Sequence, residues 1–196
     1  MTSPRLLYVA TGNPHKVEEI QAILGPLGFE VRRPDGLEDV DETGATFRDN
    51  AILKAAAAAR ALGAAVLADD SGLAVDVLDG APGVRSARYA GPDATDADNN
   101  RKLVETLEAR ETVDPEAAFV CYVVVVSPDG TVIAEAEGRV EGVIRWPARG
   151  DGGFGYDPLF HHPASGCRMA ELSPEQKNAL SHRGNALRLL AERLGG

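Results

Sequence analysis

Two neighbouring aspartates are the first residues in this chain whose types and spacing suggest chemistry. Asp69 and Asp70 follow the apolar run 64–68 and precede Ser71. Carboxylates at the end of a buried strand are costly unless a cation lies beside them, and a turn after that strand can bring both to one point. Mg²⁺ takes oxygen ligands, typically one or two carboxylates together with substrate phosphates. The pair therefore indicates either a magnesium site or a solvated turn capped by its own polar side chains.

A phosphate-binding turn is the second candidate. The apolar run 6–10 ends at the segment Thr11-Gly12-Asn13-Pro14-His15-Lys16, where a helical pattern begins. Backbone N–H groups at the start of a helix converge on one point, and Lys16 adds a positive charge one turn further on. This arrangement suits a polyphosphate, although the second glycine and the Lys-Ser/Thr pair of a Walker A loop are missing. The alternative is an ordinary strand-to-helix turn with an Asn cap.

The glycine-rich stretch 150–158 is the third candidate. It presents Phe154 and Tyr156, whose rings could stack on a nucleobase. Its Gly-x-Gly-x-x-Gly pattern is not a dinucleotide fingerprint, because no clear strand precedes it and Pro158 opposes a helix there. A loop anchored by aromatic side chains is the alternative.

A group of cationic side chains near the C-terminus is the fourth candidate. Lys177 stands five and six residues before His182 and Arg183, so the three could converge on one ligand. Lysine and arginine only donate hydrogen bonds, which suits an acceptor on a base edge. The alternative is a solvated helix face.

These groups require a framework of alternating strands and helices. Short apolar runs predict buried strands at about 6–10, 29–33, 64–68, 73–78, 119–127 and 131–139, the last two forming a hairpin. Helical patterns begin at about residues 15, 46, 95, 173 and 181, with Thr46 and Ser173 as expected N-caps. The pattern predicts one α/β domain over residues 1–196, with a mixed sheet that can divide into two lobes.

Composition excludes several classes of protein. The chain has 30 acidic and 20 basic residues, a formal net charge of −10, which argues against binding a nucleic acid polymer. Its longest apolar run has ten residues, against the ~20 that a membrane helix needs. With two cysteines and no targeting pattern at the N-terminus, we expect no disulfide framework, no membrane partner and a cytoplasmic location.

Seven ordered motifs give the chain a likeness to a known family. They are Thr-Gly-Asn-x-x-Lys at 11–16, Glu-Thr-Gly-Ala-Thr-Phe-x-x-Asn-Ala-x-x-Lys-Ala at 42–55, Ala-Asp-Asp-Ser-Gly-Leu at 68–73, Gly-Ala-Pro-Gly-Val at 80–84, Ser-Ala-Arg-Tyr-Ala-Gly at 86–91, Gly-Phe-Gly-Tyr-Asp-Pro at 153–158 and Ser-His-Arg at 181–183. This series resembles the inosine triphosphate pyrophosphatase family, whose members hydrolyse deaminated purine nucleotides (ITP, dITP and XTP). The resemblance covers roughly residues 6–193.

The resemblance implies roles for the candidate residues. Asp70 would accept a proton from the attacking water and bind Mg²⁺, with Asp69 beside it. Asp41 departs from the family's glutamate, so either Asp41 or Glu42 would supply another metal carboxylate. Substrate would contact Thr11, Gly12, Asn13, Pro14, His15 and Lys16 through its phosphates, Ser71, Phe154, Gly155, Tyr156 and Asp157 near the sugar and base, and Lys177, His182 and Arg183 at the base edge.

The resemblance also implies an architecture and a reaction. We expect an elongated mixed β-sheet flanked by helices, two lobes with an active-site cleft between them, and a homodimer. The expected reaction converts a nucleoside triphosphate and water to the monophosphate and pyrophosphate. Two alternatives stay open: a pyrophosphatase for pyrimidine or other modified nucleotides, and a nucleotide-binding module without catalysis.

Overall fold

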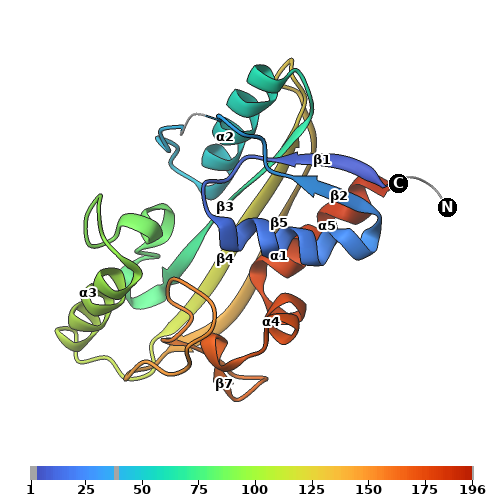
Figure 1. Ribbon diagram of the computed structural model, residues 1–196. Helices are drawn as coiled ribbons and strands as arrows, with labels where there is room; N and C mark the ends of the chain where they lie inside the picture. Colours follow the sequence, from blue (N-terminus) through green and yellow to red (C-terminus); the bar gives the residue numbers. More distant parts are fainter. Residues whose placement is uncertain (1–3, 38–39, 196) are drawn as a thin grey trace. The chain divides into compact units, whose positions relative to one another are not determined.

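A seven-stranded sheet of order β2-β1-β3-β4-β5-β6-β7 organises the computed structural model, which describes residues 4–37 and 40–195 (Figure 1). β1 pairs in parallel with β2 and β3, whereas β6 pairs antiparallel with β5 and β7. The predicted α/β class and mixed sheet are therefore confirmed. The strands are β1 (Arg5–Val9), β2 (Phe29–Arg32), β3 (Val66–Val75), β4 (Glu116–Val126), β5 (Val132–Ile144), β6 (Phe160–His162) and β7 (Cys167–Arg168). The α-helices of the described part are α1 (Pro14–Leu24), α2 (Phe47–Leu62), α3 (Asp96–Glu108), α4 (Pro174–Leu180) and α5 (His182–Gly195).

The described residues divide into two compact units, each made of several chain segments. Unit 1 contains the described residues up to Ser71, then Cys121–Arg139 and those from Ser181 onward. Unit 2 contains Gly72–Val120 and Val140–Leu180. β3, β4 and β5 contribute residues to both units, so neither unit is a continuous stretch of sequence. The cleft expected between two lobes stays a prediction.

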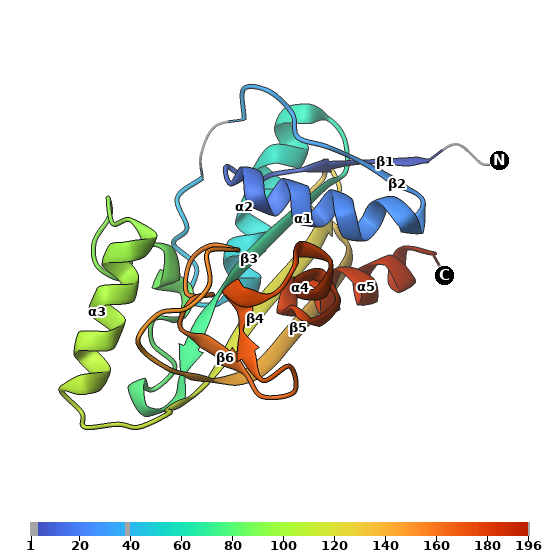
Figure 2. The ribbon, with the colours of Figure 1, turned by 60° about the horizontal axis from the view of Figure 1, so that its bottom comes forward.

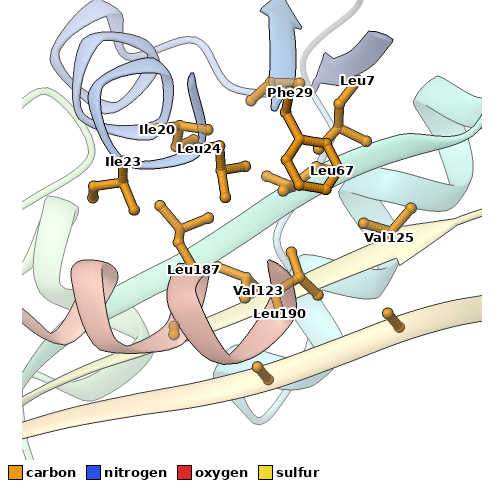
Figure 3. Close-up of a cluster of buried hydrophobic side chains, with 14 of the residues drawn as sticks. Leu7, Ile20, Ile23, Leu24, Phe29, Leu67, Val123, Val125, Leu187 and Leu190 are labelled. Atoms are coloured by element: carbon orange, nitrogen blue, oxygen red, sulfur yellow. The ribbon is translucent and has the colours of Figure 1, made fainter. Parts of the chain in front are cut away.

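Unit 1 buries one face of its strands beneath α1 and α5, which lie side by side (Figure 2). Figure 3 shows Ile20 and Leu24 of α1 and Leu187 of α5 directed toward Leu67 and Val123 of the strands. These side chains are fully buried, or nearly so, and removing their apolar surface from water stabilises this layer.

The opposite face of the same strands packs against α2. Successive residues of a strand point to opposite faces, so Val124 and Val126 of β4 meet α2 while Val123 and Val125 meet α1 and α5. The small side chains Ala55 and Ala59 are fully buried in this second layer, which lets α2 approach the sheet closely. Unit 1 therefore has helices on both faces of β3 and β4.

The helix boundaries follow from local hydrogen bonds that the sequence predicted. The Thr46 side chain accepts a hydrogen bond from the Asp49 amide and starts α2, and Gly63 ends that helix at φ 64°. Ser173 and Gln176 form the expected reciprocal cap before α4. Ser181 caps the Gly184 amide and starts α5, where helical register places His182 and Arg183 in the first turn.

Unit 2 has a core of its own beneath α3. Leu103 and Leu107 of α3 pack with Phe119 of β4 and Phe160 of β6, and the two phenylalanine rings lie 4.4 Å apart. This core supports the glycine-rich loop that begins after β5.

Candidate active site

Asp69 and Asp70 lie in the middle of β3, and the turn predicted for them is wrong. β3 runs without interruption from Val66 to Val75. The sequence Asp-Asp-Ser-Gly is typical of a turn. Here each buried carboxylate has cationic partners, which offset the cost of burying it within a strand. Because neighbouring side chains of a strand point to opposite faces, Asp69 faces the layer of α1 and α5, and Asp70 faces α2.

Asp69 is held by two cations from distant parts of unit 1. Its Oδ2 lies 3.0 Å from Lys16 Nζ and 3.0 Å from Arg183 Nη2, and it is almost completely buried. Burial alone would raise the pKa of Asp69, but the charges of Lys16, Arg183 and Lys54 outweigh burial and hold this pKa well below its usual range. Asp69 therefore stays ionised, and its Oδ1 is buried without a hydrogen-bond partner among the described residues.

Arg183 lies at the centre of this layer, with about 1% of its side chain exposed. Its guanidinium also pairs with Glu19 on α1 and donates to Ser71 Oγ at 2.9 Å. The structure thus joins two expected substrate contacts, Ser71 and Arg183, to Asp69 within unit 1. Desolvation lowers the pKa of Arg183, but the charge of Asp69 and neighbouring groups raises it overall.

Asp70 faces a different set of partners on the α2 side. Lys54 Nζ lies 2.7 Å from Glu42 Oε1 and 3.3 Å from Asp70 Oδ1, so one ammonium bridges two carboxylates. Burial raises the pKa of Asp70, Lys54 lowers it in part, and the nearby charge of Glu42 raises it further. The neighbouring aspartates consequently have pKa values displaced in opposite directions.

Asn50 on α2 fixes the position of Asp70. Its Nδ2 donates to Asp70 Oδ2 at 3.0 Å, while its Oδ1 accepts from the Gly44 amide at 2.8 Å. A backbone N–H can only donate, so the carboxamide oxygen must face Gly44 and the NH₂ group must face Asp70. Asn50 is fully buried and links the loop that carries Glu42 to the strand that carries Asp70.

Charged side chains of unit 1 gather around β3. We call the seven side chains around β3 the β3 charge cluster: Lys16, Glu19, Glu42, Lys54, Asp69, Asp70 and Arg183. Lys16 and Arg183 contact Asp69, whereas Lys54 contacts Glu42 and Asp70. The cluster therefore combines carboxylate oxygens, which suit a metal cation, with ammonium groups, which suit phosphate oxygens.

Glu42 and Asp70 are the two carboxylates that the structure brings closest to a possible Mg²⁺ site. No group of three or more His, Cys, Asp or Glu side chains within 4–37 and 40–195 could hold a metal ion. Glu42 and Asp70 both contact the Lys54 ammonium, and one or two carboxylates are the protein ligands that Mg²⁺ uses together with substrate phosphates. Asp41 is exposed, and Asp69 is engaged by Lys16 and Arg183, so the structure does not bring these two to that point.

The predicted phosphate turn lies beside a pocket of about 390 Å³. Thr11, Gly12 and Lys54 are among its lining residues. Asn13 caps α1 by accepting from the His15 amide at 3.0 Å, as the alternative of an Asn-capped turn expected. The helix begins at Pro14, one residue before the predicted start. His15 is exposed, whereas Lys16 reaches back toward β3.

The aromatic loop and Lys177 meet within unit 2. Asp157 Oδ2 accepts from Lys177 Nζ at 2.7 Å and from the Phe154 amide at 2.9 Å, and the ammonium lies 4.4 Å from the centre of the Phe154 ring. Tyr156 is buried and donates to the Ser86 carbonyl at 2.9 Å, while the Gly155 amide donates to Asp96 on α3. His182 is buried at the start of α5 in unit 1.

Two residues of the site carried a sequence signal that we did not use. Lys54 and Asn50 fall within the motif 42–55, and the chain has only four lysines, of which Lys16, Lys54 and Lys177 all lie at candidate site residues. Asp96 had no such signal, because its contact with Gly155 joins residues 59 apart in sequence.

Comparison with known proteins identifies the family of this chain. The model of the Ham1 family matches residues 7–193. The chain belongs to the Ham1 family. It is 50% identical over 188 residues to a dITP/XTP pyrophosphatase of Exiguobacterium sp., covering 94% of each chain, and 50% identical over 192 residues to one of Geobacter sulfurreducens, covering 96% of each.

Solved Ham1 structures share the fold. A HAM1 protein from Coxiella burnetii superposes with a TM-score of 0.89 at 41% identity, covering 97% of this chain and 98% of that one. The Staphylococcus aureus Ham1 protein gives 0.86 at 42% identity, covering 98% and 99%. The open sheet flanked by helices is thus common to this chain and these relatives.

Proposed function

We propose that this Ham1 protein hydrolyses deaminated purine nucleoside triphosphates, ITP, dITP and XTP, to the monophosphate and pyrophosphate. The observation that carries the proposal is the Glu42–Lys54–Asp70 arrangement, in which two carboxylates and an ammonium lie beside a phosphate-binding turn. Relatives at 50% identity that bear the name dITP/XTP pyrophosphatase support the same substrate class.

Mg²⁺ is the cofactor that we propose, with Glu42 and Asp70 as its protein ligands. When bound, it supplies charge neutralisation of the phosphates and lowers the pKa of a coordinated water. Asp70 then accepts the proton of the attacking water, a task for which a carboxylate with a raised pKa is better suited than one with an ordinary pKa. Asn50 keeps Asp70 oriented because its NH₂ group cannot turn away without leaving the Gly44 amide unpaired.

The phosphates are assigned to the first turn of α1 and to the lysines. Residues 11–16 supply backbone N–H groups and polar side chains at a helix start. The net charge of −10 repels a negatively charged substrate at long range, where salt screens the repulsion. Lys16 and Lys54 attract the phosphates at short range, where screening is weaker.

We assign recognition of the base to a hydrogen-bond donor, Lys177, and to the aromatic ring of Phe154. Hypoxanthine and xanthine carry an acceptor oxygen where adenine carries an amino donor. Lys177 can donate to that oxygen and Phe154 can stack on the ring, while Asp157 holds both in place within unit 2. Ser71, Gly155, Tyr156, His182 and Arg183 stay proposed substrate contacts.

A homodimer in the cytoplasm is the state that we propose for the active protein, as the family resemblance implies. Within the ranges 4–37 and 40–195, no helix has the length and apolar character needed to span a membrane. Size-exclusion chromatography with light scattering measures the mass directly: we expect twice 20.6 kDa, and a monomer would contradict the dimer.

Pyrophosphate release from ITP, XTP, GTP and ATP, with and without Mg²⁺, tests the function. We expect ITP and XTP well above GTP, and GTP at or above ATP, because buried donors left unpaired reject the wrong base by up to ~10⁴. Binding without release would identify a non-catalytic module. Equal turnover of ATP and ITP, or faster turnover of a pyrimidine nucleotide, would contradict the proposed base recognition.

A further inference from the structure

Three arginines of unit 2 gather where β5 ends and β6 pairs with β7. We call Arg145, Arg149 and Arg168 the arginine cluster. Directly opposite residues on adjacent strands project from the same face, and the register pairs His161 of β6 with Arg168 of β7. Val143 of β5 pairs with His161 on the other side, and Arg145 follows it two residues later.

Arg168 is a buried cation whose guanidinium forms no ion pair with any residue in 4–37 or 40–195. Only 6% of the residue is exposed. Its Nε is fully enclosed and unmatched, and so are Arg145 Nε and His161 Nδ1. Three buried nitrogens that lack partners therefore lie on this one part of the sheet.

Nearby carboxylates do not neutralise the arginine cluster. Asp114 pairs with Arg145 Nη2 at 2.6 Å, and Glu171 accepts the main-chain N–H of Arg168. Three arginines and two carboxylates leave a formal charge of +1. Burial lowers the pKa of Arg168, and the charges of Arg149 and Arg145 lower it further.

The imidazole of His161 cannot supply negative charge, because it is either neutral or cationic. Burial, Arg145 and Arg168 lower the pKa of His161, whereas Asp114 and Glu171 raise it less. A buried cation that is only partly compensated by nearby carboxylates is costly. The chain as a whole has a net charge of −10, so this local excess of positive charge does not follow from its composition.

We propose that the arginine cluster binds an oxyanion of the phosphate class, with Arg168 as its central ligand. A planar guanidinium presents paired N–H donors that match two oxygens of one phosphate, and several guanidinium groups can share a tetrahedral anion. The site uses none of the residues assigned to substrate or metal. Inorganic phosphate, the product pyrophosphate and the phosphate of a nucleotide share this chemistry.

Thermal unfolding of the full chain tests the site. The buffer contains no phosphate or sulfate and includes EDTA, and all proteins carry Lys16→Ala so that binding at the nucleotide site is weakened. Inorganic phosphate, pyrophosphate and a nucleoside monophosphate are titrated separately. Arg168→Met is compared with Arg60→Met, a matched change of an exposed arginine on α2.

Opposite effects of Arg168→Met with and without anion are the expected result. Without anion the substitution should raise Tm, because it replaces a buried unpaired charge by an apolar chain of similar length. Phosphate should raise Tm of the parent and of Arg60→Met, since a ligand that binds only the folded state stabilises it, but it should not raise Tm of Arg168→Met. The anion with the largest shift identifies the source.

Two outcomes would overturn the proposal. One is a phosphate-induced shift in Tm that is the same with and without Arg168→Met. The other is a lower Tm of Arg168→Met in anion-free buffer, which would show that Arg168 already has a counter-charge, such as one from a second copy of the chain. As a direct check, the Nε–H NMR signals of Arg145 and Arg168 should move during the phosphate titration.

Discussion

In unit 1 the β3 charge cluster joins three cationic side chains to four carboxylates, whereas in unit 2 the arginine cluster sets three arginines against two carboxylates. Carboxylates are the more numerous groups in the first cluster and guanidinium groups in the second. Buried charges are costly unless they are compensated, so the chemistry of each cluster bears on the class of ligand that it can bind. We propose a metal cation for the β3 charge cluster and an oxyanion for the arginine cluster.

Asp70→Asn breaks the first half of the comparison most severely. The substitution keeps the shape and can still accept from Asn50, but it removes the base and one charged metal ligand. We expect turnover of ITP to fall by about 10²–10⁴, in line with the loss of a positioned base. Steady-state pyrophosphate release measures the effect, with circular dichroism as the control for folding. Retention of most of the activity would contradict the role of Asp70.

Arg183→Ala tests how strongly the β3 charge cluster depends on internal pairing. The substitution leaves Asp69 and Glu19 without their shared guanidinium in a buried position. Breaking a buried pair on one side costs about 3–5 kcal/mol, and Lys16, which still contacts Asp69, places the expected loss of unfolding free energy at the lower end. Denaturant unfolding measures it. Arg183→Ala should lower the free energy of unfolding, whereas Arg168→Met should raise it in the anion-free protein. An unchanged free energy of unfolding for Arg183→Ala would contradict this contrast.

Glu42→Gln sharpens the assignment of the metal. If Glu42 and Asp70 are the ligands, the Mg²⁺ concentration for half-maximal activity should rise by at least the ~10–100-fold that follows loss of a residue supporting a metal ligand. Asp41→Asn is the matched control, because Asp41 is the exposed neighbour, and it should stay close to the wild type. Binding of Mn²⁺ followed by electron paramagnetic resonance provides a readout independent of turnover. A larger effect of Asp41→Asn would move the ligand to that residue.

The smallest expected effect is on the pH dependence of stability, because the pKa values of Asp69 and Asp70 are displaced in opposite directions. An unfolded aspartate has a pKa of about 3.9. Asp69, whose folded-state pKa is depressed, contributes stability above that value and loses it as the pH falls toward the folded-state pKa; Asp70, whose pKa is raised, contributes with the opposite sign. Carboxyl ¹³C shifts should show Asp70 titrating above about 3.9 and Asp69 ionised throughout the folded range. Equal pKa values would remove the distinction.

Sequence reasoning predicted the fold where the determinants are local. Caps such as Thr46 with Asp49 and Ser173 with Gln176 act over three residues, so the starts of α2 and α4 could be foreseen. Asp69 and Asp70 were placed in a turn because their stabilising partners are invisible in the local sequence. Arg183, which makes a buried strand conformation of Asp69 tolerable, lies 114 residues away.

The arginine cluster could not have been predicted for the same reason. Its members become neighbours only when β6 pairs with β7 beside the end of β5. A resemblance to a family identified the motifs 11–16, 42–55 and 68–73 but gave no information on charges outside them. Structure was required to show which charges are paired and which are not.

Gly138 on β5 has a consequence for how freely this sequence can change. A Cβ at this position would lie 2.0 Å from the His182 carbonyl oxygen and 2.4 Å from the Ala186 amide nitrogen, both in the backbone of α5. The start of α5 therefore rests directly on a bare stretch of main chain, and even a methyl group would lift the turn that carries Arg183. A mutant library limited to residues that contact substrate would omit this position. Gly138→Ala should nevertheless reduce activity as much as many substitutions within the β3 charge cluster. A residue without a functional side chain can therefore be essential for activity, because it lets the backbone of α5 approach β5.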